Sequence, residues 1–200
     1  MSQRRFRALV QVGLVVSVFS SLLPAQEAAN DPALLMRADA QQRMKWAAEW
    51  LSSEDPQRVA WGAWLARLEH QEHQAGLIPE LLKKLEQYQP NDNFSYATTE
   101  RDRHDAMLAV LDALIQLRAP VPTEQAHKLY AEFPAPSLIL LIRSPDDKVP
   151  ALFDIFQTAR ANANWLAAGN VLVKKPPPGF ATALLSRFTQ HSMTAGLVGV

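Results

Sequence analysis

Apolar residues recur along the chain with the period of an amphipathic α-helix. In six segments they occupy positions 0, 3, 4 and 7, the spacing that places side chains on one face of a helix. The six sets are Trp61/Trp64/Leu65/Leu68, Ile78/Leu81/Leu82/Leu85, Met107/Val110/Leu111/Leu114, Ala126/Leu129/Tyr130/Phe133, Leu152/Ile155/Phe156/Ala159 and Ala181/Leu184/Leu185/Phe188. Only the short apolar runs 137–142 and 197–200 are not assigned by this periodicity. The pattern predicts an all-α protein.

Capping residues and prolines mark the expected helix starts. Asp31-Pro32 combines an N-cap residue with proline at the first helical position, which predicts a helix running to about Leu51. Ser52 to Pro56 adds acidic residues to the same signal and opens the helix of the Trp61 stripe. A short helix is expected at 134–143 and another at 162–173. The stripes of successive first helices begin at Trp61, Met107 and Leu152, which gives a two-helix unit of about 45 residues.

The segment 53–88 resembles a HEAT repeat. Ser53-Glu54-Asp55-Pro56 is similar to the acidic-proline turn that opens the first helix of such a unit, and Leu77 to Leu82 is similar to the apolar-proline segment that opens the second. The resemblance implies stacked helical hairpins in a HEAT-like α-solenoid that holds other protein chains. Any stack of three or four helices produces the same stripes, so an irregular helical bundle is the alternative.

The first residues have the layout of a secretory signal peptide. Three arginines precede an apolar stretch from Ala8 to Leu23, which is shorter than the roughly 20 apolar residues of a spanning helix. We expect a signal peptide at 1–25 with cleavage after Ala25, and therefore a secreted or periplasmic protein; the alternative is an uncleaved anchor. The expected helical-repeat domain is 26–191. The apolar tail 192–200 either folds back onto this domain or begins a further domain that this sequence lacks.

Composition restricts the chemistry of the exported chain. It contains no cysteine, which excludes disulfides, a thiolate nucleophile and Cys-ligated zinc. Loss of the three leader arginines leaves 17 of the 20 Lys and Arg against all 20 Asp and Glu, a net charge of about −3. No basic excess indicates a nucleic-acid partner, and no later segment predicts a membrane span. The sequence assigns no catalytic residue and no cofactor.

Two clusters of titratable residues are candidates for chemistry. His70 and His73, one helical turn apart beside Glu69, could chelate a divalent metal, although their spacing fits neither zinc-protease pattern. The alternative is a solvated helix end. The charged run 101–105 could supply an acid and a base, but alternating charges in a first helical turn are typical of surface ion pairs.

Aromatic residues are the candidates for binding a partner. Trp46 with Trp50, and Trp61 with Trp64, share helix faces, and we expect both pairs in the core, with Trp61 and Trp64 as partner-binding candidates where they reach the surface. Phe94 and Tyr96 lie in the expected loop 89–98, where repeat arrays often bind partners. The alternative for this loop is a linker whose aromatics pack locally.

Together these features favour an exported helical-repeat protein that binds an unidentified protein partner or acts as a scaffold. The alternatives are a metal-dependent envelope protein or enzyme using the His70/His73 cluster, and the N-terminal helical part of a larger exported protein.

Overall fold

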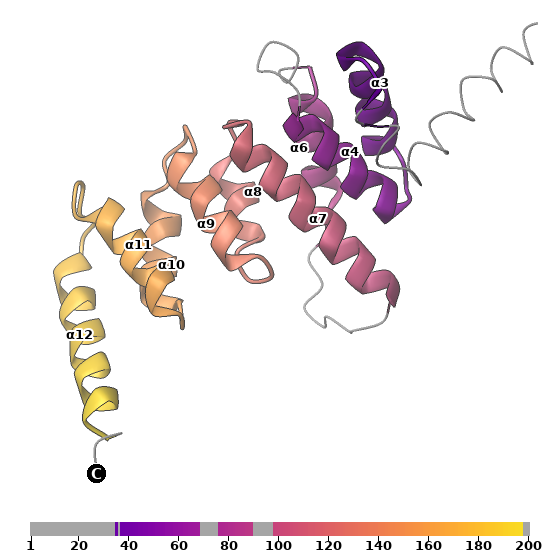
Figure 1. Cartoon of the computed structure of the whole chain (residues 1–200). Helices are drawn as coiled ribbons and strands as arrows, with labels where there is room; N and C mark the ends of the chain where they lie inside the picture. The colour runs from indigo at the N-terminus through magenta and orange to yellow at the C-terminus, as the bar shows by residue number, and fades with distance from the viewer. Residues whose placement is uncertain (1–34, 36, 69–75, 90–97, 198–200) are drawn as a thin grey trace, which may run out of the picture.

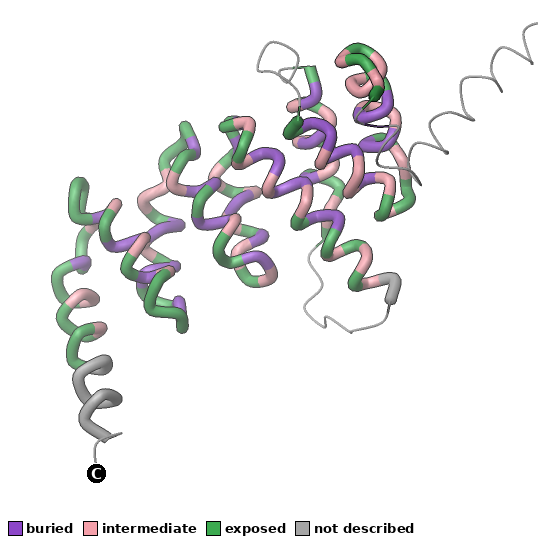
Figure 2. Tube along the Cα trace, in the orientation of Figure 1, coloured by how far each residue is buried: buried purple, intermediate pink, exposed green. Residues whose placement is uncertain are grey.

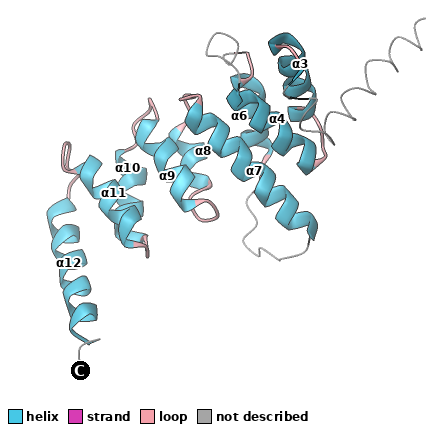
Figure 3. Ribbon diagram, viewed as in Figure 1, coloured by secondary structure: helices cyan, strands magenta, loops and turns pink. Residues whose placement is uncertain are grey.

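The computed structural model describes residue 35 and residues 37–68, 76–89 and 98–197. Every regular element in this part of the chain is an α-helix, which confirms the all-α prediction (Figure 3). The helices with assigned bounds are α3 (Ala40–Leu51), α4 (Pro56–Leu68), α6 (Ile78–Gln87), α7 (Thr98–Gln116), α8 (Thr123–Lys128), α9 (Pro134–Arg143), α10 (Val149–Thr158), α11 (Asn162–Leu172) and α12 (Phe180–Leu197).

Local capping explains where several helices begin and end. The Asp39 carboxylate accepts a hydrogen bond of 2.7 Å from the Gln42 amide at the start of α3. Asp55 accepts one of 3.0 Å from the Gln57 amide, which confirms the helix start expected there. At the end of α7, Arg118 adopts a left-handed conformation with φ of 52°. The Ala119 amide then donates to the Leu114 carbonyl, as in a Schellman motif that usually carries glycine.

The helices form an elongated stack (Figure 1). The helices α4, α7, α9 and α11 contact one another in series, while α3 packs on α4, α6 on α7, α8 on α9 and α10 on α11. Each helix of the series is thereby paired with one partner helix. The last helix, α12, packs against α10 and forms one end of the stack (Figure 1). This arrangement is a packed helical bundle.

The core lies between the series and its partner helices (Figure 2). The stripe of α7, from Met107 to Leu114, is buried, and so is the stripe of α10, from Leu152 to Ala159. The residues from Ala126 to Phe133 are also mostly buried, but α8 ends at Lys128 and a turn continues the segment. The run 137–142, left open by its periodicity, lies in α9.

The stripe expected for α4 is only partly buried. The buried residues of α4 are Val59, Gly62, Ala63, Leu65 and Ala66, whereas Leu68 is 45% exposed. The reason is a close approach to α3. A Cβ placed on Gly62 would lie 2.9 Å from the Leu51 amide nitrogen and 3.0 Å from the Ala47 carbonyl oxygen. Because only small residues fit against α3, the tryptophans of α4 are turned to the rim of the core.

The stripe expected for α12 is also largely uncovered. Leu185 is 69% exposed and Phe188 is 56% exposed, while Leu184 is half-buried. The helix α12 lies at the end of the stack and has no further helix of the described chain over this side (Figure 1). The expected boundary between a domain ending at 191 and a tail at 192–200 falls within α12, and the domain division stays a prediction.

Candidate partner-binding surface

An open apolar groove runs between α7 and α9. Its volume is about 690 Å³. The apolar residues that line it are Leu108, Ala109 and Ile115 of α7 and Ala135, Pro136 and Ile139 of α9. Leu108 is 42% exposed and Ile139 is 40% exposed, so neither side chain is covered by the fold. We refer to this feature as the α7–α9 groove.

The local sequence explains why these two side chains face outward. Met107, Leu111 and Leu114 point into the core, and Leu108 follows Met107 by about 100° around the helix. In α9 every residue from Leu138 to Ile142 is apolar, so burial of one face leaves Ile139 on the other. The groove is therefore the result of two helices that carry more apolar surface than their neighbours cover.

Two carboxylates border the groove. Asp105 and Asp112 are seven residues apart on α7, which places them about 10 Å apart on one side of the helix, with Leu108 between them. Asp112 forms an ion pair with Arg67 of α4, and Asp105 lies 3.8 Å from the Arg101 guanidinium. The Arg101–Asp105 pair confirms the surface ion pairing expected for the charged run 101–105. All four side chains are at least one-third exposed and can exchange partners.

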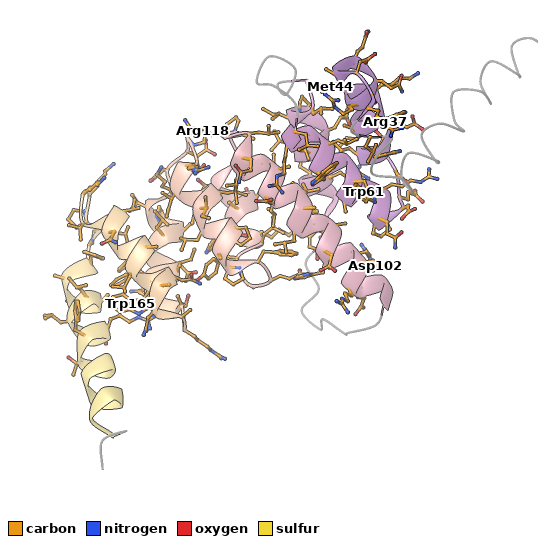
Figure 4. The ribbon with its side chains drawn as sticks, in the orientation of Figure 1. Arg37, Met44, Trp61, Asp102, Arg118 and Trp165 are labelled. Atoms are coloured by element: carbon orange, nitrogen blue, oxygen red, sulfur yellow. The ribbon has the colours of Figure 1, made fainter. Side chains whose placement is uncertain are left out.

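The Trp61–Trp64 pair lies on α4, which packs against α7. The two rings meet edge to face with centroids 5.4 Å apart, and both are half-buried at the rim of the core. Figure 4 marks Trp61 on α4 and Asp102 on α7. In contrast, Trp46 and Trp50 stack at 6.2 Å in the core, and Trp165 is 5% exposed. The core expectation is confirmed for Trp46 and Trp50, whereas Trp61 and Trp64 pack against the core and also reach the surface.

The tryptophan pair and the groove lie on two adjacent helices that run in the same direction. Val59 and Met107 line a common cavity near the start of α4, and Arg67 pairs with Asp112 near its end, so α4 and α7 run in the same direction. Trp64 and Leu108 each lie about one turn before this ion pair, at the same level of the two helices. We call the surface formed by Trp61, Trp64 and the α7–α9 groove the α4–α7–α9 surface.

A polar cluster lies elsewhere, between α6 and the turn after α8. The Tyr88 hydroxyl donates a hydrogen bond of 2.5 Å to Glu132 Oε1. Burial raises the pKa of Tyr88 well above its usual 10.0, and the hydrogen bond and negative charge of Glu132 raise it further. The adjoining cavity of about 280 Å³ has Lys84 on its wall, whose ammonium donates to the Ser53 carbonyl at 2.8 Å. A protonated tyrosine and an engaged lysine are typical of a structural contact.

The metal candidates are not placed by the structure. His70, His73 and Glu69 lie outside the described residues, as do Phe94 and Tyr96. Of the other histidines, His127 lies 3.1 Å from Asp154, and His104 stacks on Phe133 with centroids 4.6 Å apart. In the described part of the chain, no three His, Asp or Glu side chains are grouped so that they could hold a metal ion.

Comparisons of this chain with protein-family models, with curated proteins and with solved structures found no match. Within the described residues, none of the helices combines the length and apolar character that crossing a bilayer requires.

Sequence reasoning missed Leu108 and Ile139. Each lies in a helix whose apolar residues exceed one stripe, and that excess is the available signal. It does not tell which excess residues meet, because Leu108 and Ile139 are 31 positions apart and come together only through the α7–α9 contact.

Proposed function

We propose that the protein is an exported, HEAT-like helical stack that binds a protein partner through the α4–α7–α9 surface. The observation that carries this proposal is the groove: an apolar depression of about 690 Å³ in which Leu108 and Ile139 remain about 40% exposed. Contiguous exposed apolar surface with a polar rim is typical of protein interaction sites. Export rests on the layout of residues 1–25.

The chemistry of the groove indicates what it would bind. Its floor suits the apolar face of a helix or an extended apolar segment. Asp105 and Asp112 border that floor and no Lys or Arg is among its lining residues, so basic side chains on the partner would find carboxylates on either side of Leu108. The half-buried indoles of Trp61 and Trp64 add rigid contact area beside it, as aromatic residues commonly do at interfaces.

The HEAT-like part of the proposal rests on the order of contacts. Parallel α4 and α7 are consecutive members of a helix series, and each has a partner helix on its other side. Repeat arrays of this kind build their binding surfaces from successive repeats. The irregular spacing of the later helices leaves an irregular bundle as the alternative arrangement.

The test is capture of a partner by matched variants. Tagged protein is incubated with an envelope extract of the producing cells, and bound proteins are quantified by mass spectrometry. The groove variant carries Leu108→Glu and Ile139→Glu; the control carries Leu166→Glu on α11, where the replaced leucine is 45% exposed. Circular dichroism checks that all three proteins retain the same helix content.

We expect wild type and control to capture the same partner, and the groove variant to capture at least about tenfold less of it. The reason is that the glutamates would bury charge in an apolar contact. Retention by the groove variant at the wild-type level would contradict the proposed surface. Failure of wild type to capture any protein above a scrambled-sequence control would contradict the binding function itself.

A further inference from the structure

The last helix presents an apolar face that the described chain does not cover. The helix α12 packs mainly on α10, where Phe180 meets Phe156 with ring centroids 5.0 Å apart. Farther along, Phe188 touches Trp165 of α11 edge to face at 5.9 Å, near the junction marked by Trp165 in Figure 4. Even so, Phe188 remains 56% exposed and Leu185 remains 69% exposed. We call the side of α12 that carries Leu185 and Phe188 the α12 face.

The α12 face is uncharged. The 18 residues of α12 include a single Lys, Arg, Asp or Glu, which is Arg187. Its guanidinium is directed toward α10, where Nε donates to the Phe156 carbonyl at 3.0 Å and a terminal nitrogen donates to the Gln157 carbonyl. The remaining exposed positions from Ala181 to Thr189 are apolar or carry hydroxyls. Stacks of helices normally end in a polar outer face, so this end needs a cover.

A neutral face matches its own copy. An isologous interface brings the same surface together twice, so any net charge on it would be opposed by an identical charge. The α12 face has none. Apart from Arg187, the basic residues closest to α12 in the sequence are the exposed Lys174 and Lys175, in the turn that leads into its start.

The position of these lysines selects the orientation of the pair. The helix is about 26 Å long from Phe180 to Leu197. In a parallel pair, four lysines would meet at one end. In an antiparallel pair, the lysines of each copy lie beside the C-terminal end of the other α12, where the helix dipole is negative, and the two lysine pairs are separated by more than a Debye length.

We propose that α12 packs antiparallel against α12 of a second copy, about a two-fold axis near the middle of the helix, and that this pairing covers Leu185 and Phe188. Half of the lateral surface of a helix of this length is about 400 Å². An apolar groove of about 720 Å³ lies beside the Pro176–Pro178 turn and is lined in part by Val173. It extends the surface that the second copy would cover. This area lies below the roughly 800 Å² per partner of a standard interface, so the dimer is weak and concentration-dependent.

Sedimentation equilibrium of the purified protein tests the pairing, at concentrations up to about 100 µM because interfaces of this size are weak. We expect a reversible dimer for wild type and for the Leu108→Glu control, and at least a tenfold weaker association for Leu185→Glu. Because Leu185 is more than two-thirds exposed, the glutamate is compatible with the folded monomer. A monomeric wild type, or a Leu185→Glu protein that dimerises as wild type does, would overturn the proposal.

The absence of cysteine from the chain allows a second, geometric test. Near the two-fold axis a residue meets its own copy, and disulfides form only when the two Cα atoms are within about 7 Å. Under mild oxidation we expect Thr189→Cys, near the middle of α12, to form a covalent dimer and Thr182→Cys, near its start, to stay monomeric. Cross-linking of both would show a parallel pair, and cross-linking of neither would remove this face from the interface; either result overturns the proposal.

The two tests also separate this dimer from the partner surface and from a cover within the chain. If the protein is monomeric and the cysteine of Leu185→Cys resists labelling by a maleimide, another segment of the same chain covers the α12 face. That result would overturn the proposed packing against a second copy. The α4–α7–α9 surface is not involved, because Leu108→Glu tests it independently of Leu185→Glu.

Discussion

Replacing Gly62 by alanine tests the close contact between α3 and α4. The new Cβ would lie 2.9 Å from the Leu51 nitrogen, 3.0 Å from the Ala47 oxygen and 3.1 Å from Leu51 Cγ. Carbon atoms in good contact are about 3.5–4.0 Å apart, and two of these three neighbours are backbone atoms of α3 that cannot rotate away. The helix α3 must therefore move, or α4 must move away from it.

Two effects of opposite sign decide the size of the change. Alanine is favoured over glycine within a helix by about 1 kcal/mol. Overpacking against a fixed neighbour costs about 1–3 kcal/mol, and here the neighbour is a helix backbone. Because two of the three close neighbours are backbone atoms, we expect the upper part of this cost, about 2–3 kcal/mol, and therefore a net loss of about 1–2 kcal/mol in the free energy of unfolding. For a chain of 200 residues this lowers Tm by roughly 2–8 °C.

Thermal denaturation followed by circular dichroism measures this change, and Gly169→Ala in α11 is the matched control. A Cβ at Gly169 would meet only ring atoms of Phe156, at 3.0 and 3.3 Å, and a ring can shift more easily than a backbone. We expect Gly62→Ala to lower Tm more than Gly169→Ala does. An unchanged or higher Tm for Gly62→Ala would refute the close approach of α3 and α4, and with it the reason given for turning Trp61 and Trp64 outward.

The described contacts give three further predictions. Tyr88→Phe removes the hydrogen bond to Glu132 Oε1, whose Oε2 is already buried without a hydrogen-bond partner in the described chain, and should destabilise the fold by about 1–3 kcal/mol in a thermal melt. Because the pKa of Tyr88 is raised, the folded state holds its hydroxyl proton more tightly than the unfolded state does. The stability difference between wild type and Tyr88→Phe should therefore be full below pH 10.0 and decline as pH rises above it. A difference that grows above pH 10.0 would contradict the raised pKa. Acrylamide should quench wild-type tryptophan fluorescence mainly at Trp61 and Trp64, because the other tryptophans are buried. The double variant Trp61→Phe/Trp64→Phe should therefore lose most of the quenchable emission, whereas Trp46→Phe/Trp50→Phe should keep it. Equal quenching of both variants would count against the described burial.

Local signals in the sequence predicted the elements well. The Ser53–Pro56 start is confirmed because its caps act within a few residues: Ser53 Oγ accepts from the Asp55 amide, and Asp55 accepts from the Gln57 amide. The α7 and α10 stripes are confirmed because each of these helices has covering helices on its apolar side.

Burial was predicted less well, since a stripe shows which residues share a face and not what covers that face. In α4 the alternative face with Gly62, Ala63 and Ala66 permits a closer approach to α3, and this outweighs the larger apolar area of Trp61 and Leu68. In α12 the stripe of Leu185 and Phe188 is real but lies at the end of the stack. The α7–α9 groove requires knowledge of which helices touch, which no local pattern contains.

The central claim, that the α7–α9 groove binds a partner, is tested most directly by photo-crosslinking in the producing cells. A photoreactive phenylalanine analogue replaces Ile139 in the groove in one strain and Lys83, exposed on α6, in another. We expect a discrete crosslinked product of higher mass from position 139 that is absent from position 83. No crosslinked product at position 139, or the same products from both positions, would contradict the claim.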